Sequence, residues 1–291
     1  MQKPESIDDL KTLGMANGVS YCPAEIDEFA IAITRLAGDS LAIGDSEFLV
    51  LGLVRDGLIP SREALRLYAK AYGQGINGSS QEVGFDPFGD QGSRGYLRNH
   101  YKASDPNLVK MLEHLSYAIG LAQAQQYLTA TTSLGYSELL GVHRIIFDPL
   151  YPWAGRDRME TSPSLSISKG SSRVVSFAEP SDIARAVAYA LKGTDIRGTV
   201  RKNPGAILGN LAYAHPFLDG NGRALLTFVS ELFFRSGFAI RWNAIDNSEY
   251  LKVLTDEIDS PEKGIMDAFL LEYSVDISNR YQLISAMADK A

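Results

Sequence analysis

Apolar residues recur every three or four positions along most of the chain, and this spacing predicts a mostly α-helical protein. Near the N-terminus, residues 25–37 and 62–72 each carry an apolar stripe, and each segment is followed by a glycine, a common helix end. Asn203 and Ser137 are the expected N-cap residues of two later helices. The further helices expected from the pattern span 106–122, 138–147, 182–191, 204–214, 225–234 and 261–273.

One segment departs from the helical spacing. Apolar residues flank the turn-forming run 169–172 on both sides, over 165–167 and 174–177. Alternating apolar residues around a glycine-containing turn are typical of a β-hairpin. We therefore expect one short hairpin in an otherwise helical fold.

The chain also divides by composition. Residues 1–72 are expected to form a small helical N-terminal module. Residues 73–94 are rich in glycine and also contain serines, Asn77 and Pro87, and this composition predicts a long loop or linker. Residues 95–291 are expected to form the second and larger domain.

Global composition excludes several classes of protein. The chain has 291 residues, 45% of them hydrophobic, a net charge of -7 and a single cysteine, Cys22. One cysteine rules out an intrachain disulfide or a cysteine zinc cluster. The acidic balance argues against nonspecific nucleic-acid binding. No apolar run reaches the ~18 residues expected of a membrane span, and no secretory signal is recognised, so a cytoplasmic location is expected.

The segment 215–223, His-Pro-Phe-Leu-Asp-Gly-Asn-Gly-Arg, carries the clearest chemistry. Its glycine turn, residues 220–222, leads into a predicted buried helix, where backbone N–H groups and the helix dipole favour an anion such as phosphate. Asp219 would repel that phosphate unless a divalent cation, most simply Mg2+, bridges the two. His215 is placed to take a proton, because a histidine titrates near pH ~6.5.

The other histidines are interpreted differently. His100, His114 and His143 have no comparable set of polar residues beside them in the sequence. Packing or solvation is the expected role of each, and His143 falls on the apolar stripe of the helix predicted over 138–147.

This nine-residue segment resembles the signature of the Fic family, His-x-Phe-x-(Asp/Glu)-Gly-Asn-Gly-Arg, at every position. Segments 95–99, 142–147 and 151–156 resemble the family's core helices and their connecting turn. Segment 166–170 resembles its substrate-binding flap. The resemblance therefore extends well beyond the signature, over roughly the central half of the chain.

The resemblance implies a Fic-type helical core with the hairpin as a flap beside the active-site loop, within a catalytic domain of residues 95–291. The activity it implies is that of a protein adenylyltransferase (an AMPylator), which transfers AMP from ATP to a Tyr, Thr or Ser hydroxyl of a target protein. Mg2+ is the implied cofactor, and ATP is the co-substrate. The flap residues that would contact the target are Ile167, Ser168, Lys169 and Gly170.

The resemblance also assigns roles within the signature. His215 would deprotonate the target hydroxyl, Asp219 would hold Mg2+ against the phosphates, and Arg223 would neutralise charge on the leaving group. Phe217 would anchor the loop in the core. The implied nucleotide-binding residues are Phe217, Gly220, Asn221, Gly222 and Arg223.

One position departs from the family pattern. Where the family commonly has a second arginine that contacts the terminal phosphate, this chain has Leu226. Three explanations stay open. Another cation, from Arg156, Arg158, Lys169 or Arg173, replaces the arginine; or the donor differs from ATP, with UTP, GTP and CDP-choline as alternatives; or the protein is a weakly active binding module.

The family's usual inhibitory helix, Ser/Thr-x-x-x-Glu-Gly/Asn, has no complete copy in the sequence. The nearest match, from Thr227 to Glu231, is followed by Leu232. A separate inhibitor or antitoxin protein is therefore an expected partner, beside the target protein. Neither nucleic acid nor a membrane is expected as a partner. The sequence does not distinguish a protein acting in its own cytoplasm from an exported effector.

Overall fold

The computed structural model describes residues 4–19, 22–73, 98–169, 175–196 and 198–289. As expected, the described part is mostly helical with short antiparallel strands. The N-terminal helices are α1 (Ile7–Asn17), α2 (Glu25–Leu36), α3 (Asp45–Arg55) and α4 (Ser61–Gly73). The central elements are α5 (Pro106–Ala130), α6 (Tyr136–Phe147), α7 (Arg158–Thr161), β1 (Ser168–Lys169), β2 (Val175–Ser176), η2 (Pro180–Asp182), α8 (Ile183–Ala190), α9 (Thr199–Lys202), α10 (Pro204–Ala214) and α11 (Asn221–Arg235). The C-terminal elements are β3 (Phe238–Ile240), η3 (Trp242–Ala244), α12 (Asn247–Asp259), η4 (Pro261–Lys263), α13 (Ile265–Glu272), β4 (Ser274–Asp276) and α14 (Arg280–Ala288).

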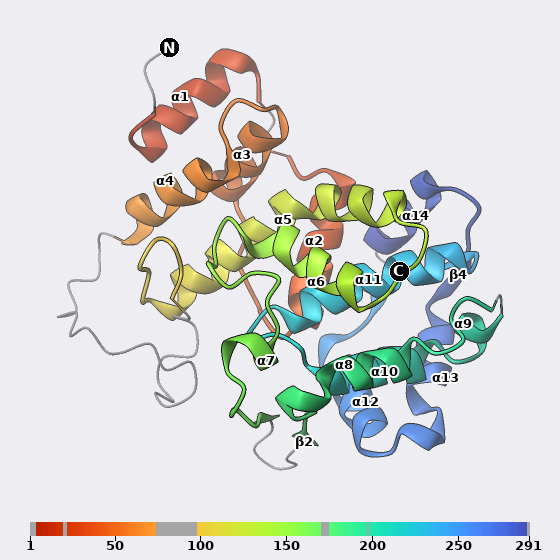
Figure 1. Ribbon diagram of the computed structural model, residues 1–291. Coiled ribbons are helices and arrows are strands. Elements are labelled where there is room, and N and C mark those ends of the chain that lie inside the picture. Colours follow the sequence, from red (N-terminus) through yellow and green to blue (C-terminus); the bar gives the residue numbers. More distant parts are fainter. Residues whose placement is uncertain (1–3, 20–21, 74–97, 170–174, 197, 290–291) are drawn as a thin grey trace.

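Helices α5 and α11 form the centre of the fold. Both pack against α6 and α2, and α11 is buried on nearly every side, as its apolar sequence predicts. Figure 1 shows α1, α3 and α4 grouped at one end, and α8, α10, α12 and α13 grouped on the other side of α11. One hydrophobic cluster runs through all of these helices. The division of the chain into two domains stays a prediction, and the N-terminal helices share their core with the rest.

The predicted hairpin forms at the expected place. Strands β1 and β2 pair antiparallel, with Ser168 opposite Ser176 and Lys169 opposite Val175. A second sheet, β3 with β4, was not predicted. Its strands lie far apart in the sequence, and all three residues of β3 are buried, so no alternation of polar and apolar residues marks that strand.

The predicted helices differ from the structure in some of their caps and boundaries. Helix α10 begins at Pro204, but the Asn203 side chain does not cap it; Asp267 of α13 accepts hydrogen bonds from the first backbone N–H groups instead. Ser137 lies inside α6, after the N-cap Gly135. The single helix predicted over 261–273 is divided at Gly264, whose φ of 62° suits glycine.

One prediction falls on residues that the structure does not describe, and some helices were not predicted. Of the predicted linker, residues 73–94, only Gly73 is described, as the last residue of α4. Helices α1, α3, α12 and α14 were not predicted individually.

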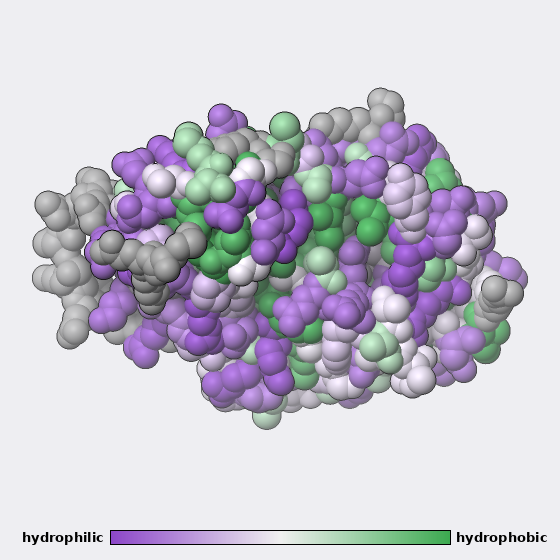
Figure 2. Space-filling view, turned by 90° about the horizontal axis from the view of Figure 1, so that it is seen from above, coloured by the Kyte–Doolittle hydropathy of each residue, from purple (hydrophilic) through white to green (hydrophobic). Residues whose placement is uncertain are grey.

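Seen from above, hydrophilic residues dominate the outer surface, with hydrophobic residues in the hollows between them (Figure 2). None of the described helices has the length and apolar character that a membrane span requires.

Candidate active site

The loop that joins α10 to α11 has left-handed backbone conformations at both ends. His215 (φ 41°) ends α10, and Gly220 (φ 73°) directly precedes α11. This conformation costs a residue with a Cβ roughly 1–2 kcal/mol, so contacts must hold His215 in place. Glycine is required at 220 for a second reason, since a Cβ there would collide with the ring of Phe147.

Asn221, the first residue of α11, closes this loop on itself. Its Oδ1 accepts from the backbone N–H of Phe217 (2.9 Å), and its Nδ2 donates to the Phe217 carbonyl (2.8 Å). These two bonds fix which end of the amide is nitrogen. The same Nδ2 lies 3.2 Å from Nε2 of His215 and therefore donates to it. Nε2 is thus the unprotonated ring nitrogen, whose lone pair accepts this bond, and a general base requires an unprotonated nitrogen.

The imidazole of His215 is also oriented by an aromatic ring from the flap. Phe177, just after β2, stacks on it with ring centroids 4.1 Å apart. His215 is only 6% exposed, yet it lines the cavity described below. The hairpin predicted from the sequence is therefore in direct contact with the predicted catalytic residue.

A buried histidine supports the loop from behind. His143 stacks on Phe217 at 3.8 Å between centroids. Its Nδ1 accepts from the backbone N–H of Gly155 (2.9 Å), so its Nε2 is the protonated nitrogen and donates to the carbonyl of Asp219 (3.0 Å). Burial lowers the pKa of His143 to about 3. The packing role predicted for His143 agrees with these contacts, which also hold the backbone of the predicted metal ligand.

Arg223 lies at the bottom of the site among acidic residues. Its Nη2 is 2.9 Å from Glu113 and 3.6 Å from Asp39, and the guanidinium is 2% exposed. Among the described residues, its Nε and Nη1 have no hydrogen-bond partner. Burial and the charge of Asp219 raise the pKa of Glu113 to about 7 although Arg223 is adjacent. The nearby carboxylates, Glu113 first, raise the pKa of Arg223 further, although burial opposes them. Arg223 therefore stays charged, and two of its nitrogens, Nε and Nη1, have no hydrogen-bond partner among the described residues.

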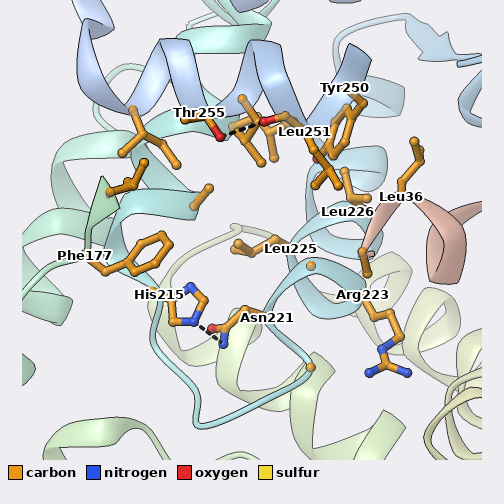
Figure 3. A pocket seen from close by; sticks show the side chains of 18 of the residues that line it. Leu36, Phe177, His215, Asn221, Arg223, Leu225, Leu226, Tyr250, Leu251 and Thr255 are labelled. Carbon is orange, nitrogen blue, oxygen red and sulfur yellow. Dashed lines mark hydrogen bonds between the residues drawn. The ribbon is translucent and has the colours of Figure 1, made fainter. Parts of the chain in front are cut away.

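A cavity of about 250 Å³ opens beside His215. Figure 3 shows His215 and Asn221 on one side of it, and Tyr250, Leu251 and Thr255 of α12 on the other. The polar lining comes mainly from the loop and the start of α11, together with Asp39 after α2. The apolar wall consists of Leu36, Ala37, Val175, Phe177, Leu208, Ala212, Leu225, Leu226, Tyr250, Leu251, Leu254 and Ile258.

Most of the predicted signature residues meet at this cavity. His215, Asp219, Arg223 and the glycine turn from Gly220 to Gly222 all line it. Phe217 does not, because its side chain is fully buried behind the loop. Its predicted anchoring role agrees with that position, and a direct contact with nucleotide does not.

The structure describes only some of the predicted flap residues. Ile167 is buried at the base of the hairpin and Ser168 is exposed on β1, while Lys169 continues that strand and pairs with Val175. Gly170 and Arg173 lie outside the described residues.

Two of the cationic side chains proposed to replace the second arginine bind other groups, away from the cavity. Arg156 forms a surface ion pair with Glu160, and Arg158 is buried with its guanidinium on backbone carbonyls. Neither lines the cavity. Leu226 is part of the apolar wall and is 1% exposed, so no guanidinium occupies that position.

No pattern in the sequence marked Asp39 or Glu113 as part of the site. Both lie more than a hundred positions before Arg223, on segments whose patterns predict only helix packing. The nearest match to an inhibitory motif also has another explanation, because Glu231 is buried and paired with Arg235 and Arg280.

The residues present fit a Mg2+–polyphosphate complex. Asp219 and Asp39 both line the cavity, so phosphate there needs a compensating cation. No group of three or more metal-binding side chains was found in the part of the chain that is described. Mg2+ is typically held by one or two carboxylates together with substrate phosphates, which matches a single ligand at Asp219. The unsatisfied N–H groups of Arg223 provide donors for an anion.

Comparison with known proteins gives the same family as the signature. Residues 133–232, about a third of the chain, match the model of the Fic/DOC family. This segment is a Fic/DOC domain. It contains α6, the flap, the active-site loop and most of α11.

Curated relatives carry enzyme names. The protein adenylyltransferase VbhT of Bartonella schoenbuchensis is 27% identical over 113 residues, which are 37% of this chain and 23% of VbhT. The probable protein adenylyltransferase y4lH of Sinorhizobium fredii is 25% identical over 167 residues, which are 54% of this chain and 81% of that protein. The chain therefore spans only about a quarter of the length of VbhT.

Solved structures agree on the fold. The crystal structure of BepC, a VirB-translocated effector of Bartonella tribocorum with bound AMPPNP, has a TM-score of 0.50 and 17% identity, covering 65% of this chain and 96% of that chain. A Fic-domain signalling protein from Bacteroides thetaiotaomicron has a TM-score of 0.50 and 16% identity, covering 99% of this chain and 92% of that chain. These matches confirm a Fic fold and carry no information on substrate.

Proposed function

We propose that this protein is a protein adenylyltransferase that transfers AMP from ATP to a Tyr, Thr or Ser hydroxyl of a target protein. The observation that carries the proposal is the unprotonated Nε2 of His215, held by Asn221 at the edge of a cavity that ends in a glycine turn and a helix N-terminus. A base and an anion site are thus adjacent, as nucleotidyl transfer requires.

In the proposed reaction the hydroxyl oxygen of the target attacks the α-phosphorus of ATP. His215 Nε2 takes the hydroxyl proton as the new oxygen–phosphorus bond forms. The bond from the α-phosphorus to the oxygen that bridges to the β-phosphorus breaks, and pyrophosphate leaves with that electron pair. The products are a phosphodiester on the target and pyrophosphate, so no covalent enzyme intermediate is needed.

The remaining residues bind and orient. N–H groups at the start of α11 would donate hydrogen bonds to the phosphates, since the Cβ-free Gly220 and Gly222 allow close approach of the backbone. Asp219 would hold Mg2+, which when bound offsets phosphate charge beside the two carboxylates. The nucleoside would occupy the apolar half of the cavity, against α12.

The flap gives the target a place to bind. Strands β1 and β2 form a sheet of only two strands, so an edge of each can pair with an extended segment of another protein. Backbone pairing of this kind tolerates many sequences. It would present a hydroxyl beside the Phe177–His215 stack.

Mass spectrometry tests this proposal without knowledge of the target, because the chain has its own Tyr, Thr and Ser residues as acceptors. The purified protein is incubated with Mg2+ and, separately, ATP, UTP, GTP, CTP or CDP-choline, then measured as intact protein and as peptides. We expect an added AMP on a hydroxyl side chain with ATP, and no adduct on His215→Ala. A different added group would replace the donor and keep the mechanism, whereas no adduct with any donor, even in the presence of cell extract, would contradict the proposal.

The alternative of a binding module with little activity rests on one observation. Leu226 makes the cavity wall apolar where an arginine would hold a terminal phosphate. This alternative predicts that the nucleotide binds without any transfer, so binding and mass measurements separate the two.

A further inference from the structure

Arg158 makes more contacts with the active-site backbone than its place on the short helix α7 would suggest. Its side chain is fully buried. Nε donates to the carbonyl of His215 (2.8 Å), Nη1 to that of Leu165 (2.9 Å) and Nη2 to that of Ala178 (2.6 Å). Its own backbone N–H donates to the carbonyl of Pro216 (2.7 Å). One residue therefore holds four backbone carbonyls.

The three carbonyls on the guanidinium belong to functionally distinct segments. Leu165 is where the chain enters the flap, and Ala178 is where it leaves after β2. Leu165 lies three residues before β1, and Ala178 lies two residues after β2. His215 is the proposed base, in a left-handed backbone conformation that its contacts must maintain. Arg158 thus ties both ends of the flap and the histidine to a single planar group.

Two further contacts extend the same arrangement. The backbone N–H of Phe177 donates to the carbonyl of Ile167 and closes the base of the hairpin, and that of Ala178 donates to the carbonyl of Tyr213 at the end of α10. The ring of Phe177 then stacks on His215. A change at Arg158 would therefore reach the imidazole by two routes, through the His215 backbone and through the flap.

The chemistry of the contacts requires arginine. Three donors that point in three directions from one rigid plane match three carbonyls, and the lysine ammonium cannot reproduce this geometry from one nitrogen. Burial of a guanidinium is unfavourable, and burial lowers the pKa of Arg158. Filling space would not need a charged group, so the arrangement points to geometric control.

We propose that Arg158 is a positioning residue that fixes the flap relative to His215, so that a hydroxyl presented on the flap edge meets Nε2. This inference rests on the proposed transfer to a protein hydroxyl. It adds that the distance between flap and base is set by one side chain outside the family signature.

The test compares Arg158→Lys with the matched control Arg156→Lys, two residues away, where the arginine is half-exposed and pairs only with Glu160 at the surface. Three quantities are measured in each protein: kcat for transfer to a protein hydroxyl, the Kd of Mg2+–AMPPNP, and the nuclear Overhauser effect between the rings of His215 and Phe177. The chain has four histidines, so the His215 ring signals can be assigned by substitution.

For Arg158→Lys we expect kcat to fall by about tenfold or more, because sub-ångström to ångström misplacement of reacting groups has effects of this size. The Kd should change by less than about twofold, and the ring-to-ring Overhauser effect should weaken. Arg156→Lys should match the wild type in all three. An Arg158→Lys protein with wild-type kcat and an unchanged Overhauser effect would overturn the proposal. A fall in kcat accompanied by an equal loss of nucleotide affinity would also overturn it, because it would indicate a general loss of structure.

The Overhauser effect separates this inference from the proposed function. If the wild type transfers nothing to a hydroxyl, the proposed function fails, and the ring contact still reports whether Arg158 positions the flap. If Arg158→Lys does not fold, backbone relaxation in the wild type decides. Leu165, Ala178 and His215 should then share rigid order parameters, about 0.85, and lower values at Leu165 or Ala178 would contradict the proposal.

Discussion

Helix α11 carries a buried ionic cluster near each end, and the two clusters differ in how completely they are paired. Near the C-terminal end, each carboxylate oxygen of Glu231 accepts from arginine side chains, those of Arg235 and Arg280, at 2.7–2.9 Å. Near the N-terminal end, Arg223 is surrounded by acidic residues, yet two of its nitrogens, Nε and Nη1, have no hydrogen-bond partner in the described structure.

The difference separates scaffold from site on one helix. A fully paired buried cluster is complete without a ligand, so its natural role is structural. In an incompletely paired cluster, buried groups without hydrogen-bond partners raise the free energy of the ligand-free protein. A ligand that supplies those partners removes this penalty when it binds. The same end of α11 also has the glycine turn, the oriented His215 and a cavity.

The largest effect is expected at the N-terminal end, from His215→Ala. Loss of a general base should lower the rate of transfer by about 10²–10⁴-fold, while the midpoint of thermal unfolding changes little. The exposed His100 provides the control, since His100→Ala should keep the wild-type rate. Rates from quantitative mass spectrometry check this, and retained transfer in His215→Ala would remove His215 as the base.

At the C-terminal end, Glu231→Gln should affect stability and leave function intact. The substitution keeps the shape but removes the charge that two guanidinium groups share, and each lost charge-assisted hydrogen bond costs about 1.5–3 kcal/mol. Both arginines are partly exposed and can regain water, so we expect a total loss of about 2–3 kcal/mol in the free energy of unfolding. Urea denaturation measures it, with the exposed Glu272→Gln as control. An undiminished stability, or a loss of nucleotide affinity, would mean that this cluster is not the purely structural one.

The support of the active-site loop should be sensitive to acid. Burial lowers the pKa values of His143 and His114 to about 3. Below about pH 6.5 the unfolded chain therefore binds protons that the folded protein does not, and stability is lost as the pH falls from there towards 3. At pH 5 each histidine should cost about 2 kcal/mol relative to neutral pH. Glu113 acts in the opposite direction, because its raised pKa of about 7 makes the folded state bind a proton first.

A substitution isolates one histidine from this balance. His114→Gln should reduce the loss of stability between pH 7 and pH 5 by about 2 kcal/mol relative to the wild type, as measured by urea denaturation at both pH values. An identical pH dependence in His114→Gln and the wild type would contradict the assignment of a buried neutral ring.

The smallest effect on stability is expected from Gly222→Ala, in the first turn of α11. An added Cβ would lie 3.0 Å from that of Ala37, a tight contact, while alanine favours the helix by roughly 1 kcal/mol. The two terms should leave the free energy of unfolding within about 1 kcal/mol of the wild type. Nucleotide affinity should still fall, because the Cβ obstructs the backbone approach. Calorimetric titration measures the affinity, and the same Kd in both proteins would argue against phosphate binding at this turn.

The sequence predicted the polar half of the site far better than the rest. His215 to Arg223 are adjacent in the chain, so their meeting at a loop and helix start follows from local pattern. The hairpin was also local, and its strands form inside the predicted segment. The described part of the fold is mostly helical, as the spacing of apolar residues indicated.

What could not be predicted depends on contacts between distant segments. Asp39 and Glu113 reach Arg223 from the segment after α2 and from α5, and nothing in their own neighbourhoods marks an ionic partner. Asp267, 62 positions after Gly205, accepts the backbone hydrogen bond expected to go to the side chain of Asn203. The apolar residues that α12 contributes to the cavity wall have the spacing of an ordinary core-facing stripe. The sequence alone does not separate the two roles, because packing and ligand binding use the same apolar side chains.

The most direct test of the central claim is calorimetric titration of AMPPNP, with and without Mg2+, into the wild type, Asp219→Asn and Glu231→Gln. The account predicts Mg2+-dependent binding to the wild type. Asp219→Asn should weaken that binding by about 10- to 100-fold and lose the dependence on Mg2+. Glu231→Gln should bind as the wild type does. Binding that is independent of Mg2+ and unchanged by Asp219→Asn, or weakened equally by both substitutions, would contradict a nucleotide site at the N-terminal end of α11.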